Sequence, residues 1–178
     1  MPHDVRVDLA RRIYQTAHIT GEFTLRSGAK SHEYFDKYLF EADPKLLKDI
    51  ATALGPLVPA GIDALAGLEM GGIPIAAMLS QLTGLPVLFV RKKAKEYGTC
   101  KIAEGGQVRG RKLLIVEDVV TSGGAILDAA KALRDEGADL SRVVCVIDRE
   151  SGGTANLAKA QLDLKPLFTM TELKAAGA

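Results

Sequence analysis

The feature that most constrains the fold is an apolar run that leads directly into an acidic pair and a small-residue turn, LLIVEDVVTSGGA at positions 113–125. An uninterrupted apolar run of this kind is typical of a strand buried on both faces of a parallel sheet. A helical pattern of apolar residues begins at Ile126. The stretch therefore predicts a strand, a turn and a helix. In α/β sheets, ligands bind where such a turn leaves the carboxyl end of a strand.

The two halves of this stretch suit two different parts of a ligand. The turn at residues 121–124 supplies two hydroxyl groups, glycines that let an anion come close, and the unpaired N–H groups of a helix N-terminus. Glu117 and Asp118, just upstream, would repel a phosphate but can accept hydrogen bonds from sugar hydroxyls. A ligand with a phosphate at one end and a vicinal diol at the other, such as ribose 5-phosphate, satisfies both halves. The alternative is an ordinary strand–turn–helix with a capped helix and a surface acidic pair.

Strand-like and helical patterns alternate along the rest of the chain. Their order predicts a mostly parallel central sheet with helices on both faces, in a single domain over residues 1–178. Between residues 21 and 40, aromatic residues that include Tyr38 and Phe40 fit β-type segments around a Ser-Gly turn. We expect strands over residues 61–69 and 86–90, a strand that begins at 113, and a strand over 142–147. We expect helices over residues 4–17, Pro44 to Leu57, 73–82, 126–137, 154–162 and 171–176.

Charge and composition exclude several classes of partner. A formal net charge of +1 gives no global attraction to nucleic acid or to membrane surfaces, so we expect neither as a partner. The charged N-terminus lacks the apolar core of a signal peptide, and the apolar region 62–90 is interrupted by acidic residues, glycines and prolines. The two cysteines, Cys100 and Cys145, show no metal-ligand spacing, and their settings argue against a disulfide. We therefore expect a cytoplasmic protein.

A charged, glycine-tipped segment over residues 91–106 follows the strand that ends at Val90. It places Arg91, Lys92, Lys93 and Lys95 within five positions. Three interpretations remain open: a solvated charged loop, a nucleic-acid patch, which the nearly neutral chain supports poorly, and a cationic lid over an anionic substrate. The lid gains weight because the opening stretch already predicts a phosphorylated ligand.

The apolar strand, Glu-Asp, two residues and Thr-Ser-Gly-Gly together resemble the phosphoribosyl pyrophosphate (PRPP) motif of the type I phosphoribosyltransferases. Arg-Lys-x-x-Lys-x-x-Gly from position 91, followed by Ile-x-Glu-Gly at 102–105, resembles the catalytic loop of the orotate phosphoribosyltransferases, although many members have histidine where this chain has Tyr97. The resemblance implies the type I phosphoribosyltransferase fold with a small N-terminal hood, formed mainly by about residues 1–40 with C-terminal elements. It also implies that PRPP is bound by Arg91, Lys92, Lys95, Glu117, Asp118, Val119, Val120, Thr121, Ser122, Gly123, Gly124 and Ala125.

Two further stretches resemble the same family. FTLRSGAKSHEYFD, at 23–36, is similar to the family's signature around the orotate base, although many relatives have lysine where Arg26 stands. Asp148-Arg149-Glu150 follows an apolar strand, and the resemblance implies that Arg149 pairs with the orotate carboxylate, for which a guanidinium fork is well shaped. Taken alone, these stretches could be a hairpin and a surface Arg–Glu pair. The orotate-binding residues implied are Arg26, Tyr34, Phe35, Thr121 and Arg149.

GLEMGGIPIA, at 67–76, resembles the loop on the pyrophosphate side of these enzymes. Many relatives carry a tyrosine–lysine pair where Met70 and Gly71 stand, so backbone N–H groups or Mg²⁺ must contribute more here. Glu69 is either a water-mediated neighbour of the metal or only a strand-end charge. The resemblance implies Mg²⁺ as the cofactor, held mainly by PRPP and without a direct protein ligand.

The implied reaction is displacement at the anomeric carbon of PRPP. A ring nitrogen of orotate replaces pyrophosphate and gives orotidine 5′-monophosphate, a step of de novo UMP biosynthesis. The implied catalytic residues are Lys95, Glu117 and Asp118, and no protein nucleophile is required. The family also implies a homodimer that shares the 91–105 loop between its subunits. The alternatives are a phosphoribosyltransferase for a purine or uracil, and a non-catalytic regulator that binds PRPP or a nucleotide.

Overall fold

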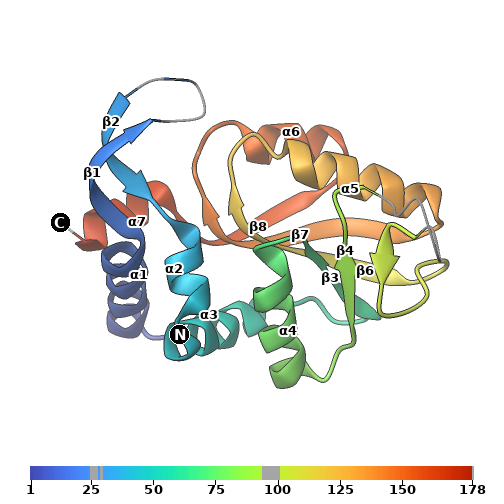
Figure 1. Ribbon diagram of the computed structural model, residues 1–178. Coiled ribbons are helices and arrows are strands. Elements are labelled where there is room, and N and C mark those ends of the chain that lie inside the picture. Colours follow the sequence, from blue (N-terminus) through green and yellow to red (C-terminus); the bar gives the residue numbers. More distant parts are fainter. Residues whose placement is uncertain (25–27, 29, 94–100, 178) are drawn as a thin grey trace.

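The structure is a computed structural model that describes residues 1–24, 28, 30–93 and 101–177. At its centre, the described strands form a six-stranded sheet in the order β5-β4-β3-β6-β7-β8 (Figure 1). Neighbouring strands are parallel except for the antiparallel pair β4–β5, so the mostly parallel sheet predicted from the sequence is confirmed. The strands are β3 Ala64–Leu68, β4 Val87–Val90, β5 Ala103–Glu104, β6 Lys112–Val120, β7 Asp139–Asp148 and β8 Asp163–Thr169.

Helices cover both faces of this sheet, α5 and α6 on one and α3 and α4 on the other (Figure 1). Successive residues of β6 alternate between two apolar cores: Leu113 and Ile115 pack on the α5 and α6 side, and Leu114 and Val116 on the opposite side. All four are at most 1% exposed, which explains why this strand has no polar face. No helix in the described ranges is long and apolar enough to cross a membrane. These four helices are α3 Pro44–Leu54, α4 Gly72–Thr83, α5 Gly124–Asp135 and α6 Gly153–Lys159.

The remaining elements gather at one end of the molecule, and we call them the hood (Figure 1). The first and last helices of the chain pack on each other there, α1 on α7. Arg6 Nη2 lies 2.9 Å from Glu172 Oε1, and the Arg6 guanidinium stands 4.4 Å from the ring centroid of Phe168. The Tyr14 ring stacks on His18 at 4.8 Å and so joins α1 to the hairpin that follows. The hood consists of α1 His3–Ala17, β1 His18–Thr24, β2 Lys30–Phe35, α2 Lys37–Ala42 and α7 Met170–Gly177.

The strand β8 was not expected from the sequence. β8 lies between the helices expected at 154–162 and 171–176, and it contains Pro166. Proline cannot donate a hydrogen bond to a sheet, which argues against a strand in the middle of a sheet. However, β8 forms the edge of the sheet and pairs only with β7, where a missing N–H is tolerated. Its buried residues are Leu164, Leu167 and Phe168.

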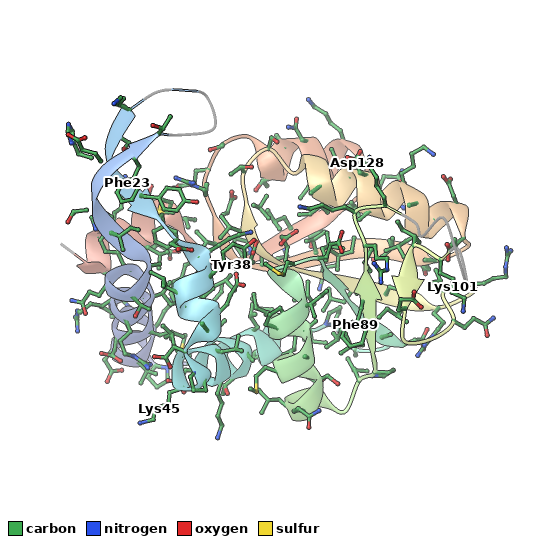
Figure 2. The ribbon with its side chains drawn as sticks, viewed as in Figure 1. Phe23, Tyr38, Lys45, Phe89, Lys101 and Asp128 are labelled. Carbon is green, nitrogen blue, oxygen red and sulfur yellow. The ribbon has the colours of Figure 1, made fainter. Side chains whose placement is uncertain are left out.

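The β-type segment expected at Tyr38 and Phe40 is wrong, because these residues lie in α2. The Asp36 side chain accepts a hydrogen bond from the Tyr38 N–H at 3.1 Å and caps this helix. Helical spacing then buries Phe40 and Glu41, whereas Tyr38 remains exposed. Figure 2 labels Tyr38 on α2, on the side of the hood that is next to the sheet.

The other boundaries differ from the expectation by small shifts. The expected cap of α3 is confirmed, because Asp43 Oδ1 accepts the N–H groups of residues 45 and 46, each at 2.9 Å. A short 3₁₀ helix, Gly55–Leu57, ends the segment that was expected to be helical up to Leu57. The loop expected over 91–106 contains the short strand β5. β7 begins three residues before the expected start at Arg142.

Candidate active site at the carboxyl edge of the sheet

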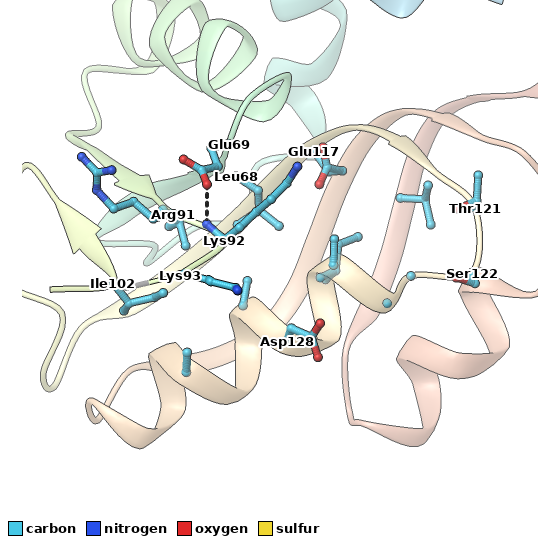
Figure 3. Close-up of a pocket in the computed structure, with 18 of the residues that line it drawn as sticks. Leu68, Glu69, Arg91, Lys92, Lys93, Ile102, Glu117, Thr121, Ser122 and Asp128 are labelled. Atoms are coloured by element: carbon cyan, nitrogen blue, oxygen red, sulfur yellow. Dashed lines mark hydrogen bonds between the residues drawn. The ribbon is translucent and has the colours of Figure 1, made fainter. Parts of the chain in front are cut away.

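A cavity of about 650 Å³ lies where β3, β4 and β6 end (Figure 3). Of the residues that the sequence assigns to PRPP, all line this cavity except Asp118 and Lys95. Lys95 lies outside the described residues, as does Tyr97. The assigned residues that line the cavity are Arg91, Lys92, Glu117, Val119, Val120, Thr121, Ser122, Gly123, Gly124 and Ala125.

The turn at residues 121–124 is shaped for the close approach of a ligand. Gly123 has a φ of +80°, a left-handed conformation that strongly favours glycine, and it precedes α5 without a described side-chain cap. The first N–H groups of α5 can therefore bind an external anion. Asn156 Nδ2 donates to the Ser122 carbonyl at 3.1 Å and holds the turn. A Cβ on Gly153 would lie 2.5 Å from the Thr121 carbonyl oxygen, so glycine is needed there as well.

Glu117 and Asp118 point to opposite sides of β6, as neighbours in a strand do. Glu117 lines the cavity, and its Oε1 accepts the Asp118 N–H at 2.9 Å. Burial, and then the charge of Asp118, raise the pKa of Glu117 well above its usual value. The Asp118 side chain is 1% exposed and lies against α2. A surface acidic pair is therefore excluded, and only Glu117 faces the cavity.

Asp118 is held by two residues of α2 that the sequence did not single out. Lys37 Nζ lies 2.5 Å from Asp118 Oδ2. Burial, and then the charge of Asp118, raise the pKa of Glu41 to about 9. Burial alone would raise the pKa of Asp118, but hydrogen bonds with Glu117, Lys37 and Glu41, and the Lys37 charge, hold it below its usual value. The i, i+4 spacing of Lys37 and Glu41 places them on one face of the helix, but no signal in the sequence indicates that this face meets Asp118.

The turn after β3 packs directly against Asp118. A Cβ on Gly71 would lie 1.6 Å from Asp118 Oδ2, and one on Gly72 would lie 2.2 Å from the Val116 carbonyl oxygen, so neither position admits a side chain. Glu69 Oε1 accepts the Lys92 N–H at 2.7 Å and ties the end of β3 to the end of β4 (Figure 3). The peptide between residues 69 and 70 is cis. The position of Asp118 thus gives a physical reason why this chain has no lysine at 71.

Arg149 follows β7 in a turn that the neighbouring acidic residues hold in place. Asp148 Oδ1 accepts the Glu150 N–H at 2.9 Å, and its Oδ2 accepts the Thr154 hydroxyl at 2.8 Å. Glu150 Oε2 accepts the N–H of Thr171 at 3.0 Å and its hydroxyl at 2.5 Å, which links this turn to α7. The Arg149 N–H donates to the carbonyl of residue 120 at 2.8 Å. The ends of β6 and β7 are therefore fixed relative to each other.

A second cavity, of about 280 Å³, brings Arg149 together with the hairpin. Of the residues that the sequence assigns to orotate, Arg149, Tyr34 and Phe35 line it. Thr121 lines the larger cavity instead, and Arg26 lies outside the described residues. The smaller cavity is also lined by Tyr14, His18, Ser31, Glu33, Met170 and Lys174.

Comparison with known proteins matches this chain to one family. Residues 40–162 match the model of the phosphoribosyl transferase domain family. The chain is 56% identical over 168 residues to an orotate phosphoribosyltransferase of Nocardioides sp., an alignment that covers 94% of each chain. It is 42% identical over 167 residues to an orotate phosphoribosyltransferase of Methanocella arvoryzae, which covers 93% of this chain and 95% of that relative.

A solved structure gives the same result for the fold. The orotate phosphoribosyltransferase of Mycobacterium tuberculosis H37Rv, in complex with inorganic phosphate, superposes with a TM-score of 0.85 at 25% sequence identity. The superposition covers 96% of this chain and 99% of that chain. The sheet and the hood are therefore shared with an experimentally determined structure.

Proposed function

This chain belongs to the orotate phosphoribosyltransferases, which transfer the 5-phosphoribosyl group of PRPP to orotate in pyrimidine biosynthesis, and we propose that its two cavities divide these substrates between them. The larger cavity would hold PRPP and the smaller one orotate. One observation carries this assignment: Glu117 and the glycine-rich start of α5 border a single cavity whose other side is cationic. A sugar that carries a phosphate at one end and a pyrophosphate at the other matches this order of groups.

The 5′-phosphate suits the start of α5. Hydroxyl groups from Thr121 and Ser122 lie beside the N–H groups of the first helical turn, and both kinds of donor favour an anion. Glu117, just upstream, would accept hydrogen bonds from the ribose hydroxyls. Asp118 would act from beneath the cavity through its charge, since its carboxylate is bound to Lys37.

The pyrophosphate suits the cationic side of the same cavity, where Arg91, Lys92 and Lys93 follow β4. We assign Lys95, from the same loop, to the negative charge that develops on the leaving group. Glu69 places a carboxylate on the β3 side of the cavity, where it would suit Mg²⁺ held mainly by pyrophosphate oxygens and water. Mg²⁺ bound in this way neutralises charge on the pyrophosphate.

Orotate suits the smaller cavity because its carboxylate requires a cation there. The Arg149 guanidinium can donate two parallel hydrogen bonds to a carboxylate, and the bonds of Asp148 and Glu150 fix the turn that carries it. Tyr34 and Phe35 border the same cavity and would contact the ring. We place Thr121 on the ring's other side, toward the ribose.

The reaction needs little covalent chemistry from the protein. The bond between the anomeric carbon and the pyrophosphate oxygen breaks, its electron pair leaves with pyrophosphate, and a ring nitrogen of orotate forms the new bond. The ribose carries positive charge at the midpoint of this exchange, and Glu117 faces it from the cavity wall. Apolar wall residues such as Leu68 and Val119 help to exclude water that could capture the ribosyl cation.

The proposal extends to the assembly and the compartment. We propose a homodimer in which the 91–105 loop of one subunit reaches the site of the other, and the exposed positions of Lys92 and Lys93 at the cavity support it. We also propose a cytoplasmic location, which the free, buried thiol of Cys145 supports.

An assay with the purified protein, PRPP, Mg²⁺ and orotate tests the assignment. Loss of orotate absorbance should depend on all components and should match the release of pyrophosphate and orotidine 5′-monophosphate. Uracil, adenine and guanine, each in place of orotate, should give no product. Turnover with one of these bases but not with orotate would overturn the base assignment. Binding of PRPP without turnover of any base would favour a regulator.

A further inference from the structure

α2 brings a lysine and a glutamate of the hood beneath the active site. We propose that Lys37 and Glu41 are positioning residues: they hold the Asp118 carboxylate under the ribose site, and the positive charge of Lys37 makes it easier for the acidic pair to ionise. This inference rests on the proposed function, because it concerns the same site. In Figure 2, Tyr38 marks the place where α2 approaches the sheet.

The first support is a pair of buried oxygen atoms that lie close together. Glu41 Oε1 and Asp118 Oδ2 are buried, and neither has a hydrogen-bond donor among the described groups other than the Lys37 ammonium paired with Asp118. A Cβ on Gly71 would lie 2.8 Å from Glu41 Oε1 and 1.6 Å from Asp118 Oδ2, so both oxygens border the same small space. Two carboxyl groups this close retain a proton between them. A proton on Glu41 lets it donate to Asp118, and both oxygens are then satisfied.

The second support is the charge balance of this unit, which contains one ammonium, one carboxylate and one carboxylic acid. Asp118 is faced by Lys37 and Glu41 from α2, by Glu117 on its own strand, and by the buried Cys145 thiol from β7. Two further titratable groups, Asp36 and Tyr38, lie next to the unit on the α2 side. Among these groups Lys37 is the cation, and its charge lowers the pKa of all three carboxyl groups.

The function of this cation follows from the position of Glu117. Burial and the Asp118 charge already favour a protonated Glu117, which would be a poor partner for a ribosyl cation. Without Lys37 the three carboxyl groups would share a proton more tightly, and Glu117 would ionise only at higher pH. Lys37 therefore shifts the acidic limb of the pH–rate profile to lower pH. An ion pair that served only to hold α2 in place would have no such effect on the profile.

Three lysine variants test this inference. Lys37→Gln removes the charge and keeps a hydrogen-bond donor, and Lys37→Arg keeps the charge. Lys131→Gln is the matched control, because the Lys131 side chain is 79% exposed on α5 and pairs only with Asp135 among the described groups. We expect Lys37→Gln to move the acidic limb of kcat/KM for PRPP upward by about one pH unit, so that the loss approaches tenfold on the acidic limb and disappears on the plateau above it.

The other variants and substrates set the limits of this effect. Lys37→Arg should restore most of the wild-type profile, Lys131→Gln should overlay it, and KM for orotate should change less than twofold in all variants. An unchanged profile for Lys37→Gln, or a loss of the same size at every pH, would overturn the inference.

A second measurement does not depend on turnover. The Asp118 carboxyl carbon can be followed by ¹³C NMR during a pH titration of the ligand-free protein. It should titrate at higher pH in Lys37→Gln than in the wild type, and coinciding curves would overturn the inference whatever the substrates are. If the wild type fails to convert PRPP and orotate while the two curves differ, the proposed function fails and the inferred charge coupling stands.

Discussion

The larger and the smaller cavity are assembled from the chain in opposite ways. The larger cavity takes most of its lining from one stretch, residues 117–132, together with the basic residues after β4. The smaller cavity collects side chains from α1, from the hairpin, from the end of β7 and from α7. A continuous lining is fixed by the local geometry of a strand, a turn and a helix, whereas a dispersed lining depends on how the hood packs on the sheet. Substitutions in the two cavities should therefore affect different substrates.

The acidic pair lies at the boundary between these two kinds of construction. Glu117 belongs to the continuous lining, but its neighbour Asp118 is seated against α2 of the hood and the turn after β3. Asp118 is buried, so neutralising it would leave the Lys37 ammonium without its counter-ion and should cost stability. The stretch that contains the acidic pair thus depends on residues distant in sequence at one position, Asp118.

Glu117→Gln should give the largest effect and should fall on the PRPP side. Glutamine resembles the protonated form of Glu117 that burial favours, so we expect the fold to be retained. It cannot provide negative charge to a ribosyl cation, and kcat should fall by about 10²- to 10³-fold, with little change in KM for orotate. Steady-state kinetics with each substrate varied measures both values. Glu136→Gln, at the far end of α5, is the control, and a kcat within threefold of the wild type for Glu117→Gln would remove Glu117 from the mechanism.

Gly71→Ala tests whether the continuous motif depends on the turn after β3. The added Cβ would meet Asp118 Oδ2 at 1.6 Å, so Asp118 or the turn must move, and we expect a loss of about 1–3 kcal/mol in the free energy of unfolding. Activity should fall with it, because the acidic pair is displaced. Gly55→Ala is the matched control: Gly55 has helical dihedral angles, φ −47° and ψ −48°, and a Cβ there has no neighbour within 4 Å. Urea unfolding that gave the same free energy for Gly71→Ala and the wild type would mean that Asp118 is not seated as described.

Arg149→Ala should affect the other cavity. Loss of a charge-assisted pair of hydrogen bonds costs about 1.5–3 kcal/mol, so KM for orotate should rise by about 10- to 100-fold while KM for PRPP changes by less than about twofold. Arg142→Ala is the control, because Arg142 lies on β7, the strand that precedes Arg149, and pairs with Asp163 at 3.3 Å on the surface. Equal increases in both KM values would show that the two cavities do not separate the substrates.

The same division explains what the sequence could predict. Residues 113–125 contain their own strand, turn and helix start, so the fold class and the sugar-phosphate side could be inferred from one stretch. Pro166 argues against a strand at β8 unless that strand lies at the edge of the sheet, where a proline is acceptable. The order of strands in a sheet depends on contacts between distant residues, so the edge position could not be inferred from the local sequence. Lys37 was missed because it contacts Asp118 only after the hood has packed on the sheet. No local pattern in the sequence indicates that contact.

A pH-dependent change in stability measures how strongly the hood acts on Asp118. Glu41 has a pKa raised from its ordinary value of 4.5 to about 9. Between these two values the folded protein holds a proton that the unfolded chain has released, so stability falls as the pH rises, by up to about 1.4 kcal/mol per pH unit. Glutamine at position 41 does not ionise, and Glu41→Gln should remove this dependence. The Tm of the variant minus that of the wild type should therefore increase steadily from pH 6 to pH 8.5.

The sign of this change separates two descriptions of the acidic unit. A shared proton between Glu41 and Asp118 makes the wild type lose stability relative to Glu41→Gln as the pH rises. If Glu41 were instead ionised and stabilised by Lys37, glutamine would weaken that pair by a similar amount at every pH in this range, and the difference in Tm would be constant. A constant difference in Tm would therefore show that Glu41 and Asp118 do not share a proton, and Glu41 would no longer have a role in holding Asp118 beneath the ribose.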